Sequence, residues 1–157
     1  MSARPSPFDA EQIRTQVEVL YAERRRVRFQ DVDAASTIYF PRVLEYFADA
    51  YLGLLTAAGL DVPRMLRERI SAAPLRHAEA DFLEPLFFGD EVEVEVVTAK
   101  LGRSSVSFGH RLKNAAGRAA AIGHTTHVFV DGKSFQPIDV PRELAAYLEA
   151  RGVVRGS

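Results

Sequence analysis

The 157-residue chain is 47% hydrophobic and 26% charged, which suits one domain with a buried core and argues against a disordered chain. A net charge of -1 offers no basic surface for nucleic acid, and the lack of cysteine excludes disulfides, thiol catalysis and thiolate metal sites. There is no apolar signal core and no run of about 20 apolar residues, so we expect a cytoplasmic protein that does not contact a membrane.

The start of the chain shows few signs of regular structure. Prolines and serines are frequent in MSARPSPFDAEQ, so we expect residues 1–20 to form a flexible segment and residues 21–157 to form a single domain. The stretch RRRVRFQDVD follows, in which apolar Val27 and Phe29 alternate with polar residues. This period of two predicts a strand.

The strongest helical pattern of the chain comes next. Apolar residues recur at spacings of three and four along one face, at Val43, Leu44, Phe47, Ala50, Tyr51, Leu54, Leu55 and Ala58. Pro41 suits the first helical position, where its missing N–H costs nothing, and Gly59 suits the stop. Because this apolar face is wide and carries aromatic residues, we expect the helix to be largely buried.

The second half of the chain alternates mostly with a period of two. A loop or short helical turn is expected at LDVPRMLRERIS, and strands are expected at PLRHAEADFLEPLFFGD, EVEVEVVTAKL, SSVSFGHRL and RAAAIGHTTHVFVDG. The glutamates of EVEVEVVTAKL share one face, which predicts that this face meets water. VPRELAAYLEA predicts a C-terminal helix. One long buried helix with antiparallel strands indicates an α+β fold, whose free sheet edges offer a dimerisation surface.

Asp33 is the first candidate for chemistry, because it stands just before the predicted helix. The helix dipole stabilises such a carboxylate by about 0.3–1 kcal/mol, so ordinary capping is one explanation. The other explanation uses the free N–H groups of the first turn, which can bind a developing oxyanion while the carboxylate attacks a carbonyl or takes a proton from water. Asp31 and Asp33 also form an Asp-x-Asp pair, but no third acidic ligand follows closely, so we predict no metal site there.

The histidines and one glycine-containing turn are weaker candidates. His124 and His127 lie three apart in a predicted strand and so point to opposite faces, which argues against a shared metal. No Gly-x-Ser-x-Gly elbow supplies a serine nucleophile. We interpret the four histidines as structural or surface residues, with His77 as the one most open to a functional role. The GRSS stretch, with Arg103 and Ser104, suits either a phosphate contact or a plain hairpin turn.

The stretch RFQDVDAASTIYFPRVLEYF resembles the signature of the 4-hydroxybenzoyl-CoA thioesterase-like family of hotdog-fold acyl-CoA thioesterases. The match runs from Val27 to Phe47, and the order of elements agrees over residues 24–130. The resemblance implies a hotdog fold, in which a curved antiparallel sheet of about five strands wraps a long central helix and a short C-terminal helix follows. It also implies a homodimer or homotetramer, and no cofactor beyond the CoA carried by the substrate.

The resemblance assigns roles to residues around the helix start. It makes Asp33 the catalytic carboxylate, and it makes Tyr39 and Phe40 the place where a backbone N–H polarises the thioester carbonyl. Pro41 has no N–H to donate, so Phe40 is the expected donor. The expected substrate-binding residues are Ser36, His77, and, as loose counterparts of the family's CoA contacts, Arg103 and Ser104.

Two positions depart from the family's pattern. Ser36 stands where relatives usually have glycine, which either alters the turn that aims Asp33 or puts a hydroxyl into the site. Many relatives carry an acid at the position of Ala48, and here the acid is Asp49. Because a helix turns about 100° per residue, we expect Asp49 not to replace that acid. Substrate choice is the property that these changes affect most.

We therefore predict a thioesterase that hydrolyses an acyl-CoA to the free acid and CoA, with Asp33 as nucleophile or general base. The family alone points to an aromatic acyl group such as hydroxybenzoyl. Two alternatives remain open. A hotdog acyl-thioester dehydratase or hydratase would need a histidine in the site, and a non-catalytic module would bind acyl thioesters without turnover.

Overall fold

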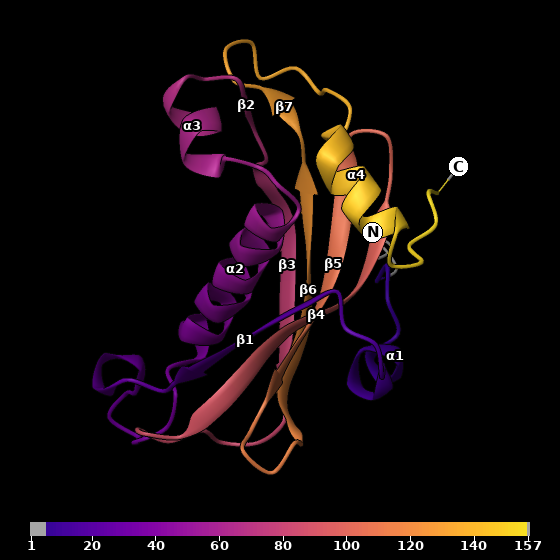
Figure 1. The fold of residues 1–157 in the computed structure, drawn as a ribbon. Coiled ribbons are helices and arrows are strands. Elements are labelled where there is room, and N and C mark those ends of the chain that lie inside the picture. Colours follow the sequence, from indigo (N-terminus) through magenta and orange to yellow (C-terminus); the bar gives the residue numbers. More distant parts are fainter. Residues whose placement is uncertain (1–5, 157) are drawn as a thin grey trace, which may run out of the picture.

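A five-stranded antiparallel sheet wraps around one long helix in the computed structural model, which describes residues 6–156 (Figure 1). Its helices are α1 (Ala10–Thr15), α2 (Phe40–Ala57), α3 (Val62–Arg67) and α4 (Arg142–Glu149), and a 3-10 turn covers Phe29–Asp31. The sheet has the order β1 (Tyr21–Arg26), β4 (Glu91–Leu101), β5 (Ser105–Lys113), β6 (Ala119–Val128) and β3 (Leu75–Phe82), beside the short pair β2 (Ser71–Ala72) and β7 (Val130–Asp131). The predicted α+β architecture is confirmed.

The central helix α2 fills the concave side of the sheet, as its apolar stripe predicts. Its buried residues are Val43, Tyr46, Phe47, Ala50, Tyr51, Leu54 and Leu55, and they pack against apolar side chains of β4 and β5. The helix begins at Phe40, so Pro41 holds the second helical position rather than the first. Gly59 follows the helix with φ of 95°, a conformation that glycine adopts without strain.

The strand predicted around Val27 and Phe29 is wrong in its extent. β1 ends at Arg26, and Phe29 lies in the 3-10 turn. The reason is local, because the Asp31 carboxylate folds back and accepts hydrogen bonds from the backbone and side chain of Arg28. A side chain that accepts hydrogen bonds from the nearby backbone in this way competes with the hydrogen bonds between strands.

The face of β4 that carries its glutamates is only partly exposed to solvent, contrary to the prediction that this face meets water. Glu91 is exposed, but Glu95 is only 2% exposed and pairs with Arg111 at 2.5 Å. The same guanidinium donates hydrogen bonds to the carbonyl oxygens of Ile13, Arg14 and Gln16 at the end of α1. Arg111 therefore satisfies a buried carboxylate and the carbonyl end of a helix together.

The N-terminal segment, for which the sequence predicts flexibility, contains the short helix α1. Residues 1–5 lie outside the described residues, but α1 packs on the sheet through Phe8 and Ile13, which are 6% and 3% exposed. Figure 1 shows α1 and α2 on opposite sides of the sheet. We call these two sides the α1 face and the α2 face. None of the helices in the described part of the chain is long and apolar enough to cross a bilayer.

Candidate active site

A tight loop presents Asp33 beside the N-terminus of α2. The Asp33 carboxylate accepts a hydrogen bond from Ala35 N–H at 2.8 Å, and its backbone pairs with Thr37 O and Ser36 N–H at 3.0 and 2.9 Å. Bridges from Val32 to Ile38 and from Thr37 to Phe87 close the loop. One carboxylate oxygen of an exposed Asp33 is thus held by the turn.

Ser36 occupies the position in this turn that requires a left-handed backbone. Its φ is 65°, a region that costs a residue with a side chain about 1–2 kcal/mol and costs glycine little. This explains why the resemblance leads one to expect glycine there. The serine keeps the turn at the expense of local strain.

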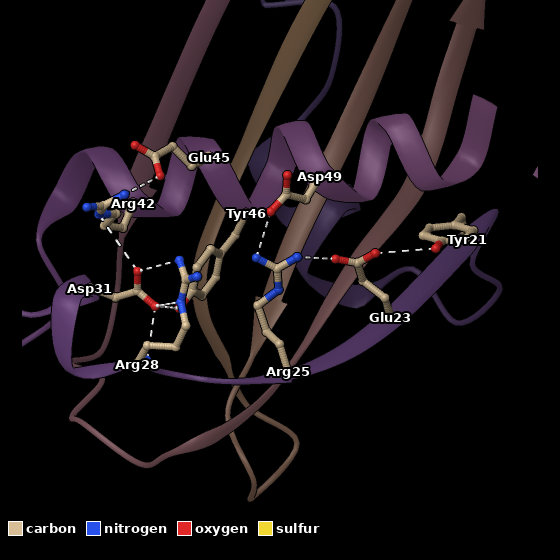
Figure 2. Close-up of polar contacts among 9 residues, drawn as sticks. All are labelled: Tyr21, Glu23, Arg25, Arg28, Asp31, Arg42, Glu45, Tyr46 and Asp49. Carbon is tan, nitrogen blue, oxygen red and sulfur yellow. Dashed lines mark hydrogen bonds and ion pairs between the residues drawn. The ribbon is translucent and has the colours of Figure 1, made fainter. Parts of the chain in front are cut away.

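Asp31, in contrast, is completely buried and serves the structure (Figure 2). Its carboxylate accepts hydrogen bonds from the backbone and guanidinium of Arg28 at 3.0 to 3.1 Å and from the Tyr46 hydroxyl at 2.6 Å. Arg42 lies 3.7 Å away, and the carbonyl oxygen of Asp31 accepts the N–H of Tyr39 at 2.7 Å. Asp31 thereby ties the loop to two turns of α2.

The surroundings of Asp31 keep its carboxyl group ionised. Burial alone would raise its pKa, but hydrogen bonds from Arg28 and Tyr46 outweigh burial and lower the pKa to about 2. Burial and the neighbouring Asp31 carboxylate raise the pKa of Tyr46, so its phenol stays a proton donor. A carboxylate that stays charged near neutral pH and is fully hydrogen-bonded stabilises the geometry of the loop.

A second set of polar contacts runs from β1 to α2. Figure 2 shows Arg25 between Glu23 and Asp49, with its guanidinium 2.9 Å from the Asp49 carboxylate. Arg25 also lies over the ring of Tyr46, 4.4 Å from its centroid. Asp49 is therefore engaged with β1. Asp49 does not line the cavity beside Asp33, and the expectation that it does not replace an acid at the position of Ala48 stays a prediction.

Asp33 lines a cavity of about 410 Å³ between the start of α2, the end of β3 and β6. The cavity walls are mostly apolar, with Ile38, Phe40, Val43, Phe82, Leu86 and Ala121 among them. The rings of Phe40 and Phe82 meet edge to face, with centroids 6.2 Å apart. A volume of this size, with mostly apolar walls and the carboxylates of Asp33 and Glu84 at its edge, suits a small organic group.

Of the backbone N–H groups at the start of α2, from Tyr39 to Arg42, only that of Phe40 lacks an acceptor among the described residues. Tyr39 N–H is bonded to Asp31 O, Arg42 N–H is bonded to Tyr39 O, and Pro41 has no N–H. Among the described residues, no acceptor pairs with Phe40 N–H. The role of Phe40 N–H as the oxyanion donor stays a prediction.

The structure does not bring every predicted site residue to this cavity. The ring of Tyr39 packs on Phe40 beside it, with centroids 5.3 Å apart. Arg103 and Ser104 sit in the β4–β5 turn, at the end of the sheet far from Asp33, and Arg103 pairs with Asp139. His77 is exposed on β3 and contacts Glu79. A role in binding substrate stays a prediction for Arg103, Ser104 and His77, and so does the catalytic role of Tyr39.

Sequence reasoning missed two residues of the site. Glu84 lines the cavity, and its carboxylate is held by Asn114 at 2.7 Å and Arg118 at 2.9 Å. Its hydrogen bonds to Arg118 lower the pKa of Glu84. Tyr46 was missed because its hydroxyl contacts Asp31, which lies fifteen residues away in the chain. Its position three residues after Val43 in the apolar stripe does indicate that it is buried.

Comparison with known proteins agrees with this geometry. A model of the thioesterase-like superfamily matches residues 27–148. The 1,4-dihydroxy-2-naphthoyl-CoA hydrolase of Nostoc punctiforme is 32% identical over 82% of this chain and 86% of its own length. Two solved structures share the fold. A Synechocystis 1,4-dihydroxy-2-naphthoyl-CoA thioesterase has a TM-score of 0.76 at 23% identity over 82% of this chain and 94% of its own. A gentisyl-coenzyme A thioesterase has a TM-score of 0.72 at 24% identity over 79% and 98%.

Proposed function

This chain belongs to the thioesterase-like superfamily and is a thioester hydrolase, and from that premise we propose that it hydrolyses an aromatic acyl-CoA with Asp33 as the catalytic carboxylate. One observation carries the proposal. Asp33 and Phe40 line the same apolar cavity, and the N–H of Phe40 has no acceptor among the described residues. A carboxylate and an unused donor at one helix N-terminus can act on one carbonyl group.

In the nucleophilic route, an oxygen of Asp33 attacks the thioester carbon and the carbonyl oxygen becomes an oxyanion that accepts Phe40 N–H. Collapse of this intermediate breaks the C–S bond, and the departing CoA thiolate takes a proton from water. Water then hydrolyses the acyl–Asp33 anhydride, which restores the carboxylate and releases the acid. In the general-base route, Asp33 takes a proton from water while the water oxygen attacks the same carbon. Collapse of the tetrahedral intermediate then breaks the C–S bond, and protonated Asp33 gives its proton to the departing CoA sulfur, which restores the carboxylate.

The proposal of an aromatic acyl group rests on the residues that line the cavity and on the names of the relatives. Phe40 and Phe82 offer ring edges and faces to a planar group. The Nostoc relative is named for a 1,4-dihydroxy-2-naphthoyl thioester, and a structural neighbour is named for a gentisyl thioester. We propose that this chain prefers a hydroxylated aromatic acyl group over a linear aliphatic one.

We also propose that the chain forms at least a homodimer through β3. β3 is an edge of the five-stranded sheet, and its apolar Leu75 and Phe82 are 54% and 52% exposed. An exposed apolar edge pairs readily with a second copy. If two β3 strands pair antiparallel, the two sheets run in opposite directions. The end of one sheet that carries the β4–β5 turn then lies toward the end of the other sheet that carries Asp33. This geometry gives Arg103 and Ser104 a route to the CoA of a neighbouring site, and light scattering after size exclusion tests the dimer.

The decisive experiment measures CoA thiol release from aromatic and aliphatic acyl-CoAs by the wild type and by Asp33→Asn. Asparagine keeps the size of the side chain and removes its charge. We expect the variant to lose roughly 100-fold or more in kcat, the range of a positioned acid–base group. Asp49→Asn is the matched control, because it changes an aspartate of α2 outside the cavity, and we expect it to keep its activity.

Other outcomes would favour other functions. Equal activity of Asp33→Asn and wild type would show that Asp33 is only a turn residue. Binding of acyl-CoA without turnover would favour a non-catalytic module. Hydration of an enoyl-CoA without release of CoA would favour a dehydratase, although no histidine lines the Asp33 cavity within the described residues.

A further inference from the structure

Three side chains with metal-binding atoms meet on the α1 face of the sheet. They are His77 and Glu79 of the edge strand β3 and His124 of the neighbouring strand β6. Glu79 lies directly opposite His124 in the strand register, and His77 is two residues before Glu79, so all three side chains share one face. Their ligand atoms all lie within 4.8 Å of one another.

The Glu79 carboxylate connects the two imidazoles. One of its oxygens is 2.8 Å from Nδ1 of His124, and the other is 3.3 Å from Nε2 of His77. The rings stack with centroids 4.9 Å apart and an angle of 23°. Zinc held tetrahedrally at about 2.0–2.2 Å keeps its ligand atoms roughly 3.3 Å apart. Small side-chain movements would therefore suffice to place an ion among these three groups.

The surroundings supply both support and space. The His124 side chain is 3% exposed and packs edge to face with the Phe8 ring, with centroids 6.1 Å apart. Ser6 Oγ is 3.5 Å from Nδ1 of the same histidine. A cavity of about 160 Å³ lined by Ser6, Phe8, Glu79, Asp81 and His124 adjoins the group. Since one water takes about 30 Å³, an ion and a water ligand can be accommodated.

We propose that His77, Glu79 and His124 form a binding site for a divalent transition metal ion, with Zn²⁺ as the best match. Two imidazoles and one carboxylate are a common zinc ligand set, which leaves a fourth position for water. Harder ions such as Mg²⁺ prefer a set made only of oxygens. The site lies on the other side of the sheet from the Asp33 cavity, so the ion takes no part in thioester chemistry. The ion would join the edge strand β3 to β6.

The test is calorimetric titration of the untagged, chelator-treated protein with ZnCl₂ and, separately, with MgCl₂. We expect one Zn²⁺ per chain with a dissociation constant in the micromolar range or below, and no Mg²⁺ binding. His77→Gln and Glu79→Gln each remove one ligand at a half-exposed position, so the fold is preserved. Each is expected to weaken Zn²⁺ binding by at least about tenfold.

Glu91→Gln is the matched control, because Glu91 is an exposed glutamate of the same sheet outside the group. It is expected to bind Zn²⁺ like the wild type. Co²⁺ is a second probe, and its visible absorption reports a tetrahedral site that His77→Gln should abolish. A wild type that binds no Zn²⁺, or a Glu79→Gln variant that binds it as tightly as the wild type, would overturn the proposal. None of these measurements depends on substrate or on Asp33.

Discussion

The hydroxyl of Tyr46 donates a 2.6 Å hydrogen bond to the buried carboxylate of Asp31. This contact joins the second turn of α2 to the 3-10 turn that precedes the Asp33 loop. Because the carbonyl of Asp31 also holds Tyr39 N–H, the start of α2 and the loop are fixed relative to each other. The proposed catalytic pair of Asp33 and Phe40 N–H depends on this junction for its geometry.

Removing the Tyr46 hydroxyl is expected to destabilise the protein. Tyr46→Phe leaves a buried carboxylate with one fewer donor, and a hydrogen bond to a charged group contributes about 1.5–3 kcal/mol. Urea unfolding should show a loss in this range. Tyr21→Phe is the control, since that hydroxyl bonds a partly exposed Glu23 at 3.3 Å and should matter less. Equal losses in the two variants would contradict the role given to Tyr46.

The stability that Asp31 provides is expected to disappear in acid. Its pKa is about 2 in the folded protein and about 3.9 in an unfolded chain, so folding favours the charged form. The stabilisation, about 2–3 kcal/mol, is complete above the unfolded pKa and is lost as pH falls from about 4 to about 2. Urea unfolding of wild type and Asp31→Asn across this range should show the difference between them shrinking. A difference that stays constant with pH would contradict this assignment, and Ser36→Gly, which adds no titrating group, provides the control.

Replacing Ser36 by glycine is expected to stabilise the protein. The serine has φ of 65°, and relief of this strain should raise the free energy of unfolding by about 0.5–1 kcal/mol after the greater chain entropy of glycine is included. Ser36→Ala removes the hydroxyl but keeps the strain, so its stability should match that of the wild type. If the free energy of unfolding rises equally in both variants, the strain does not lie at the backbone of residue 36. The KM of Ser36→Ala tests separately whether the hydroxyl contacts substrate.

Removing the N–H of Phe40 is expected to impair catalysis. Phe40→Pro is tolerated at the first helical position, and Tyr39, with φ of -67° and ψ of 123°, already has the conformation that a residue before proline prefers. The loss of one oxyanion donor should lower kcat by about 10²- to 10³-fold. Phe40→Ala keeps the N–H and removes the ring, so it should affect KM more than kcat. Similar kcat values for the two variants would exclude this donor.

The central helix and the place of Asp33 beside its start were predictable because their signals are local. The apolar stripe from Val43 to Leu55 repeats with the period of a helix, and packing on the sheet needs only that stripe. Asp33 and Phe40 flank the helix start within eight positions of the chain, so their joint position could be predicted from the sequence and the family signature.

The extents of other elements were not predictable, because they depend on partners distant in the chain. Glu95 alternates like a solvent-exposed residue, yet Arg111 and α1 bury it. Val27 and Phe29 alternate like a strand, yet the hydrogen bonds of Asp31 turn the chain. A polar residue on a strand face is stable in the core when a cross-strand partner neutralises it.

The sequence by itself determined the α+β class, the buried helix α2 and the acid at its start, because periodicity and turn chemistry act between near neighbours. Tertiary structure decided which side chains meet. Strand register placed Glu79 opposite His124, 45 positions apart in the chain, and folding brought Phe82 of β3 to the cavity of Asp33. Contacts of this kind are set by how strands align and how a helix lies on a sheet, and no local pattern specifies either one.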